Sequence, residues 1–252
     1  MAKRILFFAY GVAVYLMFLA TFLYAIAFVG GFAPTSLDGA AITPTMLALT
    51  IDVGLLTLFA VQHSVMARPW FKSRWTRIVP SAIERSTYVL CASAALALLC
   101  WQWRPLGGIV WSVEEPTLRA LLWTVFAAGW LLVLTMTFFI DHFDLFGVRQ
   151  VWLNLVGRPY THVPFATPMP YRIVRHPLYL GFLLAFWATP TMTWAHLFFA
   201  VATTSYVLLA IQFEETDLSR EYGTAYLEYR RRVPMLLPIG RPSTHVDEAV
   251  IR

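Results

Sequence analysis

Long apolar stretches are the feature that most limits how this chain can fold. Four of them have the length that a helix needs to cross a bilayer, at about residues 5–29, 45–66, 86–103 and 117–140. No water is available in the hydrocarbon core to pair with backbone polar groups, so we expect these segments to be helices. The charged content of 13% supports a membrane protein, because soluble domains carry about 25% charged residues.

A fifth apolar region, at about 178–213, is interrupted by Pro190. Its first part, 178–190, makes a helix of only about 20 Å at 1.5 Å per residue, whereas 194–213 is long enough to cross. We therefore predict a helical hairpin that turns at "TPTMT" (189–193). The first arm of this hairpin is expected to be tilted or partly re-entrant.

The predicted fold is an all-α polytopic membrane bundle with five to six transmembrane segments. No Gly-rich strand-turn-helix pattern is visible, so a Rossmann sheet is not expected. The chain is predicted to form a single membrane domain. Residues 1–140 would hold four spans, and residues 141–252 would hold a polar connection, the hairpin and a tail.

The basic residues are distributed unevenly around these segments. With the N-terminus in the cytoplasm, 17 of the 19 Lys and Arg residues lie on the cytoplasmic side, and only Arg104 and Arg119 lie outside. This asymmetry matches the positive-inside rule and predicts that both termini face the cytoplasm. The net charge of +5 is then explained by loops that attract anionic lipid headgroups, and no nucleic-acid partner is predicted.

The segment "YRIVRHPLYLG" (171–181) places Arg172, Arg175 and His176 directly before an apolar run. Pro177 suits the first turn of a helix, where its missing N–H group needs no partner. The start of that helix would offer free N–H groups and a partial positive charge beside two guanidinium groups. The pattern indicates a carboxylate or phosphate guest, and snorkelling of the arginines toward lipid headgroups is the alternative.

Glu214 and Glu215 lie at the other end of the hairpin, still next to apolar sequence. A carboxylate at that depth is costly and usually faces a partner or a cavity. The two glutamates either pair with Arg172 or Arg175, or they accept hydrogen bonds from a bound ammonium group or ribose diol.

Three tyrosines follow the glutamates on one helical face, namely Tyr222, Tyr226 and Tyr229. Packing is the default interpretation of such a stripe. A wall against an adenine ring is the alternative.

Further polar groups lie in the second and fourth spans or at their ends. His63 and the pair Asp141 and His142 are expected at the same membrane face as the RHP segment, while Asp52 lies deeper. Each one is either hydrogen-bonded to a neighbouring helix or functional, and an intramembrane carboxylate is a functional candidate by default.

Histidine spacing argues against a metal centre. None of the six histidines lies three or four residues from another, as the histidine sets of membrane di-iron enzymes do. We therefore predict no metal site. A haem held between spans by two of His63, His142 and His176 stays open as an alternative.

"YRIVRHPLYLG" and "EETDLSREYGTAYLEYRRRVPMLLP" together resemble the C-terminal half of the isoprenylcysteine carboxyl methyltransferase-like membrane enzymes. That group carries RHPxYxG, then EExxLxxxxGxxYxxY, then VPxxxP. Beyond the RHP segment, the matching positions are Glu214, Glu215, Leu218, Gly223, Tyr226, Tyr229, Val233, Pro234 and Pro238.

The first half of the chain contains "VQHSVMARPWFK", "PSAIERSTYVL" and "FFIDHFDLFGVRQVWL". These segments are similar to the bacterial methanethiol S-methyltransferases. The resemblance implies an all-helical enzyme of the bacterial inner (plasma) membrane that converts methanethiol and S-adenosylmethionine to dimethyl sulfide at the cytoplasmic face.

The resemblance also implies a shell for S-adenosylmethionine. Together with the neighbouring Arg172, its residues would be Arg175, His176, Tyr179, Gly181, Glu214 and Glu215. Denitrification-linked membrane proteins and sterol reductases share the C-terminal pattern. A methyltransferase or reductase acting on a lipid, or a haem-binding respiratory assembly subunit, therefore remains an alternative function.

A thiol attacks as the thiolate, and a cysteine-like thiol has a pKa of about 8.5, so a base would help the reaction. Asp141 with His142 is the first choice for this base, and His63 is the second. The sequence leaves the preferred thiol and the oligomeric state open.

Overall fold

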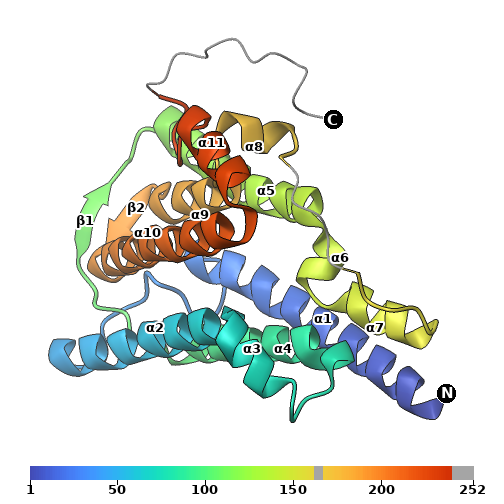
Figure 1. The fold of residues 1–252 in the computed structure, drawn as a ribbon. Coiled ribbons are helices and arrows are strands. Elements are labelled where there is room, and N and C mark those ends of the chain that lie inside the picture. Colours follow the sequence, from blue (N-terminus) through green and yellow to red (C-terminus); the bar gives the residue numbers. More distant parts are fainter. Residues whose placement is uncertain (162–166, 240–252) are drawn as a thin grey trace.

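The computed structural model describes residues 1–161 and 167–239, and most of these residues are helical (Figure 1). The elements are, in chain order, α1 (Ala2–Val29), α2 (Thr45–Ala67), α3 (Pro69–Trp75), α4 (Ser81–Gln102), β1 (Ile109–Ser112), α5 (Pro116–Ile140), α6 (His142–Leu145), α7 (Val148–Leu155), α8 (Met169–Ile173), α9 (Pro177–Trp187), β2 (Thr191–Thr193), α10 (Trp194–Tyr222) and α11 (Thr224–Arg232). Within the described ranges, five helices are long and apolar enough to cross a membrane, namely α1, α2, α4, α5 and α10. The prediction of a helical integral membrane protein is confirmed, and the described ranges contain no Rossmann sheet.

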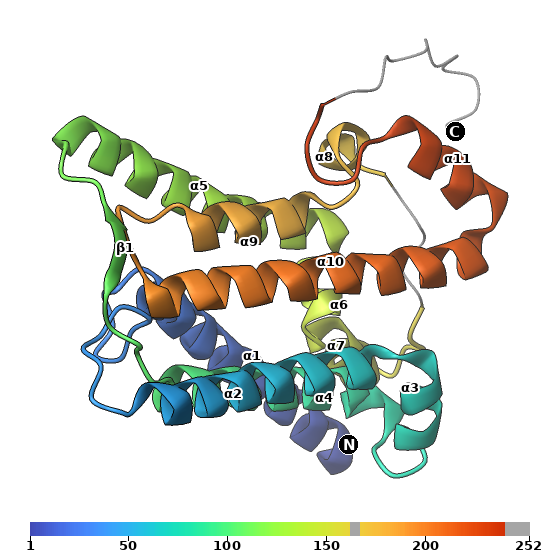
Figure 2. The ribbon, with the colours of Figure 1, turned by 90° about the vertical axis from the view of Figure 1, so that its left-hand side faces the viewer.

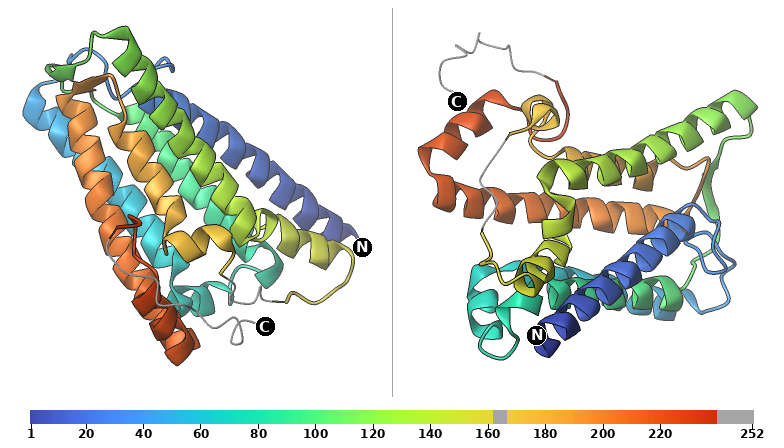
Figure 3. Two further views of the ribbon diagram at one scale, coloured as in Figure 1. Left: turned by 90° about the horizontal axis from the view of Figure 1, so that it is seen from above. Right: turned by 90° about the vertical axis from the view of Figure 1, so that its right-hand side faces the viewer.

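The helices form two layers (Figure 2). In the first layer, α4 packs against both α1 and α2, and α7 lies against α1 and α4. In the second layer, α9 packs along α5, and α10 lies beside α9. Figure 3 shows the same helices from two further directions. The two parts expected to meet at residue 140 are therefore interlocked, because α5 packs with the later helices and α7 packs with the earlier ones.

β1 and β2 form a short antiparallel pair, which the sequence did not predict. Ile109 is opposite Thr193 and Ser112 is opposite Thr191, with an irregularity between them. Since β1 lies between α4 and α5, this pairing brings the start of α10 to the end of the bundle where α4 stops. We call this end the strand end. The opposite end holds α3, α8 and α11, and we call it the basic end (Figure 2).

The pairing of β2 shows how the hairpin crosses the bundle. α9 has 11 residues and is about 16 Å long, and the non-helical residues that follow add about 3.3 Å each. Helix and extended segment together reach from the basic end to the strand end, roughly the thickness of a hydrocarbon core. The first arm predicted at 178–190 is therefore a short apolar helix, Pro177–Trp187, followed by an extended segment.

α5 and α9 approach each other closely through two glycines. A Cβ atom on Gly181 would lie 2.8 Å from the carbonyl oxygen of Gly129 and 3.0 Å from the backbone nitrogen of Val133. A Cβ atom on Gly129 would lie 2.7 Å from the backbone of α9. Only hydrogen fits at these two positions, so the glycines set the distance between the helices.

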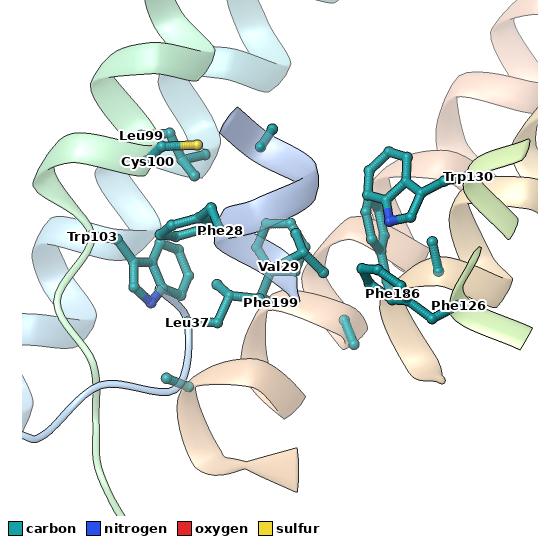
Figure 4. Packing of buried hydrophobic residues seen from close by; sticks show 14 of the residues in the cluster. Phe28, Val29, Leu37, Leu99, Cys100, Trp103, Phe126, Trp130, Phe186 and Phe199 are labelled. Atoms are coloured by element: carbon teal, nitrogen blue, oxygen red, sulfur yellow. The ribbon is translucent and has the colours of Figure 1, made fainter. Parts of the chain in front are cut away.

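One apolar core joins the two layers (Figure 4). It contains Phe28 from α1, Leu99 and Cys100 from α4, Trp130 from α5 and Phe199 from α10. A second, smaller cluster has its buried members on α1, α2 and α4. The layers thus share apolar packing in one part of the bundle, and polar contacts join α2 to α10 toward the basic end.

α10 is longer than the apolar stretch that predicted it. The sequence indicated a span at 194–213, and the helix continues to Tyr222 before Gly223, which has a positive φ of 56°, ends it. The extra turns carry charged residues beyond the apolar stretch. Glu214 and Glu215 therefore lie on a rigid helix.

Candidate active site

Arg175, His176 and Glu215 form a buried cluster at the basic end. Arg175 Nε and Nη2 each lie 2.8 Å from Glu215 Oε1, and His176 Nε2 lies 3.0 Å from the same oxygen. Only 9% of the Arg175 side chain and 3% of the Glu215 side chain are exposed. Because a buried charge is costly without its partner, this cluster ties the start of α9 to α10.

α11 completes the cluster. Arg230 Nε lies 3.1 Å from the second carboxylate oxygen of Glu215. Arg175 Nη1 donates to the carbonyl oxygens of Arg230 at 3.0 Å and Val233 at 2.5 Å. Both oxygens of Glu215 are therefore occupied, and the expected alternative of pairing with Arg175 is what the structure has.

The segment after α11 lies beside the start of α9. The backbone N–H groups of Arg175 and His176 donate to the carbonyl oxygens of Pro234 at 2.9 Å and Met235 at 3.1 Å. The N–H groups expected to be free belong to the first turn of α9, from Pro177, and these two N–H groups precede it. The chain's own VPxxxP segment takes them, which explains why this segment accompanies the RHP segment.

Tyr222 ends α10, and Gly223 separates it from Tyr226 and Tyr229 on α11, so the expectation that the three share one helical face is wrong. Tyr226 and Tyr229 belong to the same framework as the cluster. Tyr226 is 1% exposed, and burial raises its pKa to about 12. The Tyr229 hydroxyl donates to the carbonyl oxygen of Tyr171 at 2.6 Å. These contacts support the packing interpretation.

Glu214 differs from its neighbour because it stays accessible. Its side chain is 44% exposed, and Oε2 lies 3.9 Å from His176 Nδ1, too far for a hydrogen bond. The Tyr179 hydroxyl lies within hydrogen-bonding reach of the Glu214 carboxylate. Of the two glutamates, Glu214 is the one whose oxygens can accept from a ligand.

Two further predicted site residues lie outside this cluster. Arg172 is exposed, and its Nε donates to the carbonyl oxygen of Thr167 at 3.2 Å. Gly181 lies against Gly129 of α5. The structure thus gives Gly181 a packing role.

His142 is held by the first and fourth spans. Its side chain is buried, with Nε2 2.7 Å from the Tyr15 hydroxyl and Nδ1 2.8 Å from Thr137 Oγ1. The carboxylate of Asp141 was expected to orient this ring, but it accepts from the backbone N–H of Asp144 instead and caps α6. Burial lowers the pKa of His142, and the charge of Asp141 offsets this only in part.

His142→Gln is expected to lower stability and to weaken its dependence on pH. The change leaves the hydroxyl of Tyr15 or Thr137 without its partner, which lowers the free energy of unfolding by about 1–3 kcal/mol. A histidine with a lowered pKa in the folded state stabilises the protein above about pH 6.5, and this stability is lost as the pH falls further. Thermal unfolding of both proteins at pH 7 and pH 5 measures the difference. An identical pH response would contradict this assignment.

His63 has a different environment. Its ring stacks on Phe59 with centroids 5.3 Å apart, and the Tyr88 hydroxyl lies 3.1 Å from each ring nitrogen. The Tyr88 hydroxyl can hydrogen-bond only one of the two His63 nitrogens at a time. The described part of the chain provides no other hydrogen bond to this ring.

The residues around His63 connect α2 with α10. Ser64 Oγ lies 3.0 Å from the Tyr206 hydroxyl, and Arg68 Nη1 lies 2.7 Å from Asp217 Oδ2. Sequence reasoning missed Tyr206. The available signal was a polar hydroxyl inside an apolar span, which the membrane makes costly unless it is bonded.

Tyr179 lies near both the Glu214 carboxylate and the residues around His63. It lies close enough to Glu214, Tyr206 and Tyr88 to interact with them electrostatically. Phenol groups from α4, α9 and α10 thus lie near one another, with Tyr179 beside Glu214 and Tyr88 bonded to His63. Sequence reasoning also missed Tyr88, although it lies three residues from Arg85 in a segment that the resemblance had singled out.

Asp52 does not belong to this group. It is fully buried, and its Oδ1 accepts from the backbone N–H of Arg104 at 2.9 Å, just after α4. The strand end is therefore its location. Its candidate role next to the RHP segment is not supported.

The histidines considered for haem have separate partners. His63 contacts Tyr88, His142 contacts Tyr15, and His176 contacts Glu215. Among the described residues, no three His, Cys, Asp or Glu side chains gather closely enough to hold a metal ion.

Comparison with known proteins gives one family model and several relatives. The model of the phospholipid methyltransferase family matches residues 122–225. The chain is 54% identical to a methanethiol S-methyltransferase of Mycobacterium tuberculosis, over 94% of this chain and 97% of the relative. It is 52% identical to one of Crocosphaera subtropica, over 93% and 92% of the two chains. Nurim of Xenopus laevis is 32% identical over 69% of this chain and 64% of its own length. No solved structure matches.

Proposed function

The chain belongs to the family of methanethiol S-methyltransferases, and on that premise we propose that it methylates methanethiol with S-adenosylmethionine to give dimethyl sulfide. The observation that carries this proposal is the 54% identity over 94% of the chain. Coverage of that extent includes both layers of the fold. The cluster at the basic end supports the proposal independently, because it has an accessible carboxylate beside a rigid cationic frame.

The residues at the basic end fit the methyl donor. S-Adenosylmethionine carries an ammonium group, a carboxylate and a ribose diol, and it supplies a methyl group on positively charged sulfur. Glu214 would accept hydrogen bonds from the diol or the ammonium group, with Tyr179 beside it. The first turn of α9 and the exposed Arg172 suit the carboxylate. Arg175, His176 and Glu215 would hold these groups in place.

The protein's main contribution to the reaction is position. Holding the attacking thiol sulfur in line with the methyl group lowers the activation free energy by several kcal/mol. Attack by a thiolate on a sulfonium joins opposite charges into neutral products. A site that excludes water therefore favours the reaction, because it disfavours the charged reactants more than the neutral products.

We further propose that the protein lies in the bacterial inner membrane with the basic end in the cytoplasm. The positive-inside asymmetry of 17 of 19 Lys and Arg residues supports this orientation. Both termini would then be cytoplasmic. Methanethiol and dimethyl sulfide are small and apolar, so they would enter and leave through lipid.

A lipid acceptor is the second candidate, favoured by the match to the phospholipid methyltransferase model. A cavity of about 700 Å³ lies between α5, α9 and the segment after α11. Side chains such as Leu180, Leu184, Trp187 and Leu237 line it, and none of the lining side chains carries a charge. Such a groove suits acyl chains, and it offers no group that would hold a polar headgroup for reaction.

The two candidates separate in one experiment. Purified protein is incubated with S-adenosylmethionine and either methanethiol or vesicles of phosphatidylethanolamine, and release of S-adenosylhomocysteine is measured. Release with methanethiol alone is the expected result. Release only with vesicles would replace the thiol by a lipid acceptor.

Glu214→Gln is expected to weaken binding of S-adenosylhomocysteine by about tenfold or more, because hydrogen bonds to a charged group contribute about 1.5–3 kcal/mol. Equilibrium titration measures the change. Glu221→Gln, at the exposed end of the same helix, is the matched control and should bind normally. Equal affinity of the Glu214 variant and the wild type would remove Glu214 from the donor site.

A further inference from the structure

We infer that the acceptor thiol binds between the two layers at the His63–Tyr88 pair, where His63 accepts the thiol proton and Tyr88 orients the ring. This inference rests on the proposed methyl transfer. It names the acceptor side of that site, and it replaces His142 as the expected base.

The hydrogen bonds of the histidines support His63. Both nitrogens of His142 are bonded, to Tyr15 and Thr137. Both nitrogens of His196 lie 3.0 Å from oxygen atoms, at Asp38 and the Phe186 carbonyl. A histidine with two bonded nitrogens has no lone pair to offer to a thiol.

His176 is unsuited for another reason. Its Nε2 lies 3.0 Å from Glu215, and its Nδ1 faces the carboxylate of Glu214 at 3.9 Å. The ring is thus tied into the Arg175–Glu215 cluster, on the proposed donor side of the site. Among the histidines in the described ranges, this leaves His63, whose ring has only the Tyr88 hydroxyl to share between two nitrogens.

The position of the pair also fits an acceptor site. Apolar packing joins the layers in one part of the bundle, whereas the Ser64–Tyr206 contact at 3.0 Å joins them beside His63. Tyr179 lies within electrostatic reach of both Tyr88 and Glu214. The acceptor would therefore lie on the inner side of the proposed donor site, deeper in the membrane, where an apolar thiol arrives.

The charges around the pair favour a thiolate. The Arg85 guanidinium lies 4.9 Å from the centre of the Tyr88 ring and interacts electrostatically with His63. Other charged groups in reach of Tyr88 are Arg68, which is paired with Asp217, and Glu84. The positive charges nearest the pair would stabilise an anionic sulfur.

The proton and electrons balance as follows. The S–H bond of the thiol breaks, and its proton moves to the free nitrogen of His63. The sulfur's electron pair forms a bond to the methyl carbon, while the bond between that carbon and the donor sulfur breaks and leaves its electrons on the donor sulfur. His63 then returns its proton to water, so no further reactant is needed.

The test uses the purified full chain with His63→Gln and Tyr88→Phe. His63→Gln should lower turnover of methanethiol about 100-fold at neutral pH and keep its affinity for S-adenosylhomocysteine. The deficit should shrink as the pH approaches the pKa of the free thiol, where solvent supplies thiolate. Tyr88→Phe should lower turnover about tenfold. Its pH profile should match that of the wild type, as expected for a positioning residue that leaves the base in place.

Tyr10→Phe is the matched control. It removes a hydroxyl that bonds Thr87 at 3.1 Å, at the adjacent position of α4, and it should leave turnover unchanged. A second readout does not depend on turnover. Methanethiol added to protein loaded with S-adenosylhomocysteine should produce the ultraviolet absorbance of a thiolate at neutral pH in the wild type and not in His63→Gln.

Three results would overturn the inference. They are full turnover of His63→Gln at neutral pH, a loss of turnover that stays constant with pH, and a thiolate signal that persists without His63. In each case the wild type still makes dimethyl sulfide. A wild type that makes none would instead overturn the proposed function.

Discussion

Arg175→Ala is expected to destabilise the protein by about 3–5 kcal/mol and to abolish measurable binding of S-adenosylhomocysteine. The change leaves the Glu215 carboxylate buried without its closest partner, which costs this much in typical buried ion pairs. It also releases the carbonyl oxygens of Arg230 and Val233. The start of α9 and the segment after α11 would then separate. Thermal unfolding and equilibrium titration measure the two effects.

Arg172→Ala is the matched control for this variant. Arg172 lies three residues earlier and is exposed, and within the described ranges its side chain hydrogen-bonds only the backbone at Thr167. Its loss should change stability by less than about 0.5 kcal/mol and affect binding only modestly. Equal effects of the two variants would show that stability and binding depend on net positive charge and not on the buried cluster.

Gly181→Leu is expected to destabilise the protein by about 1–3 kcal/mol or more, as overpacking does. The new Cβ atom would lie 2.8 Å from the Gly129 carbonyl oxygen and 3.0 Å from the Val133 nitrogen. These are backbone atoms of α5 and cannot move aside as a side chain does, so α9 would shift as a whole. His176 and Tyr179 in its first turn would shift with it, and affinity for S-adenosylhomocysteine should fall in parallel with the melting temperature.

Gly54→Leu separates this effect from the general cost of changing a glycine in a membrane helix. Gly54 lies on α2, where an added Cβ atom meets nothing within 4 Å. This variant should be as stable as the wild type or more stable, because leucine favours a helix over glycine by roughly 1 kcal/mol. A Gly181 variant as stable as the Gly54 variant would contradict the close helix contact.

The membrane helices could be predicted from the sequence because their signal is local. A run of about 20 apolar residues forms a spanning helix whatever its neighbours are. The extended path after α9 could not be predicted, because it depends on β2 pairing with β1, which lies about 80 residues earlier. The end of α10 was also missed, since charged residues continue a helix as readily as apolar ones once it leaves the lipid.

The residues of the candidate site could be named from the sequence, but the environments that distinguish them could not be predicted. Glu214 and Glu215 look alike in a sequence, and they differ only because Arg175 and Arg230 close on one of them. His63 and His142 both lie near span ends. What distinguishes them is Tyr15, a residue of α1 that bonds His142 across 127 positions of the chain.

The most direct test of the account follows a labelled methyl group. Purified protein in lipid vesicles receives S-adenosylmethionine labelled on the transferred methyl, together with methanethiol, and the label is counted in the volatile fraction and in the lipid. Labelled dimethyl sulfide is expected in the volatile fraction, with much less of it from Glu214→Gln. Label absent from the volatile fraction, while S-adenosylhomocysteine still binds to the wild type, would contradict methyl transfer to this thiol.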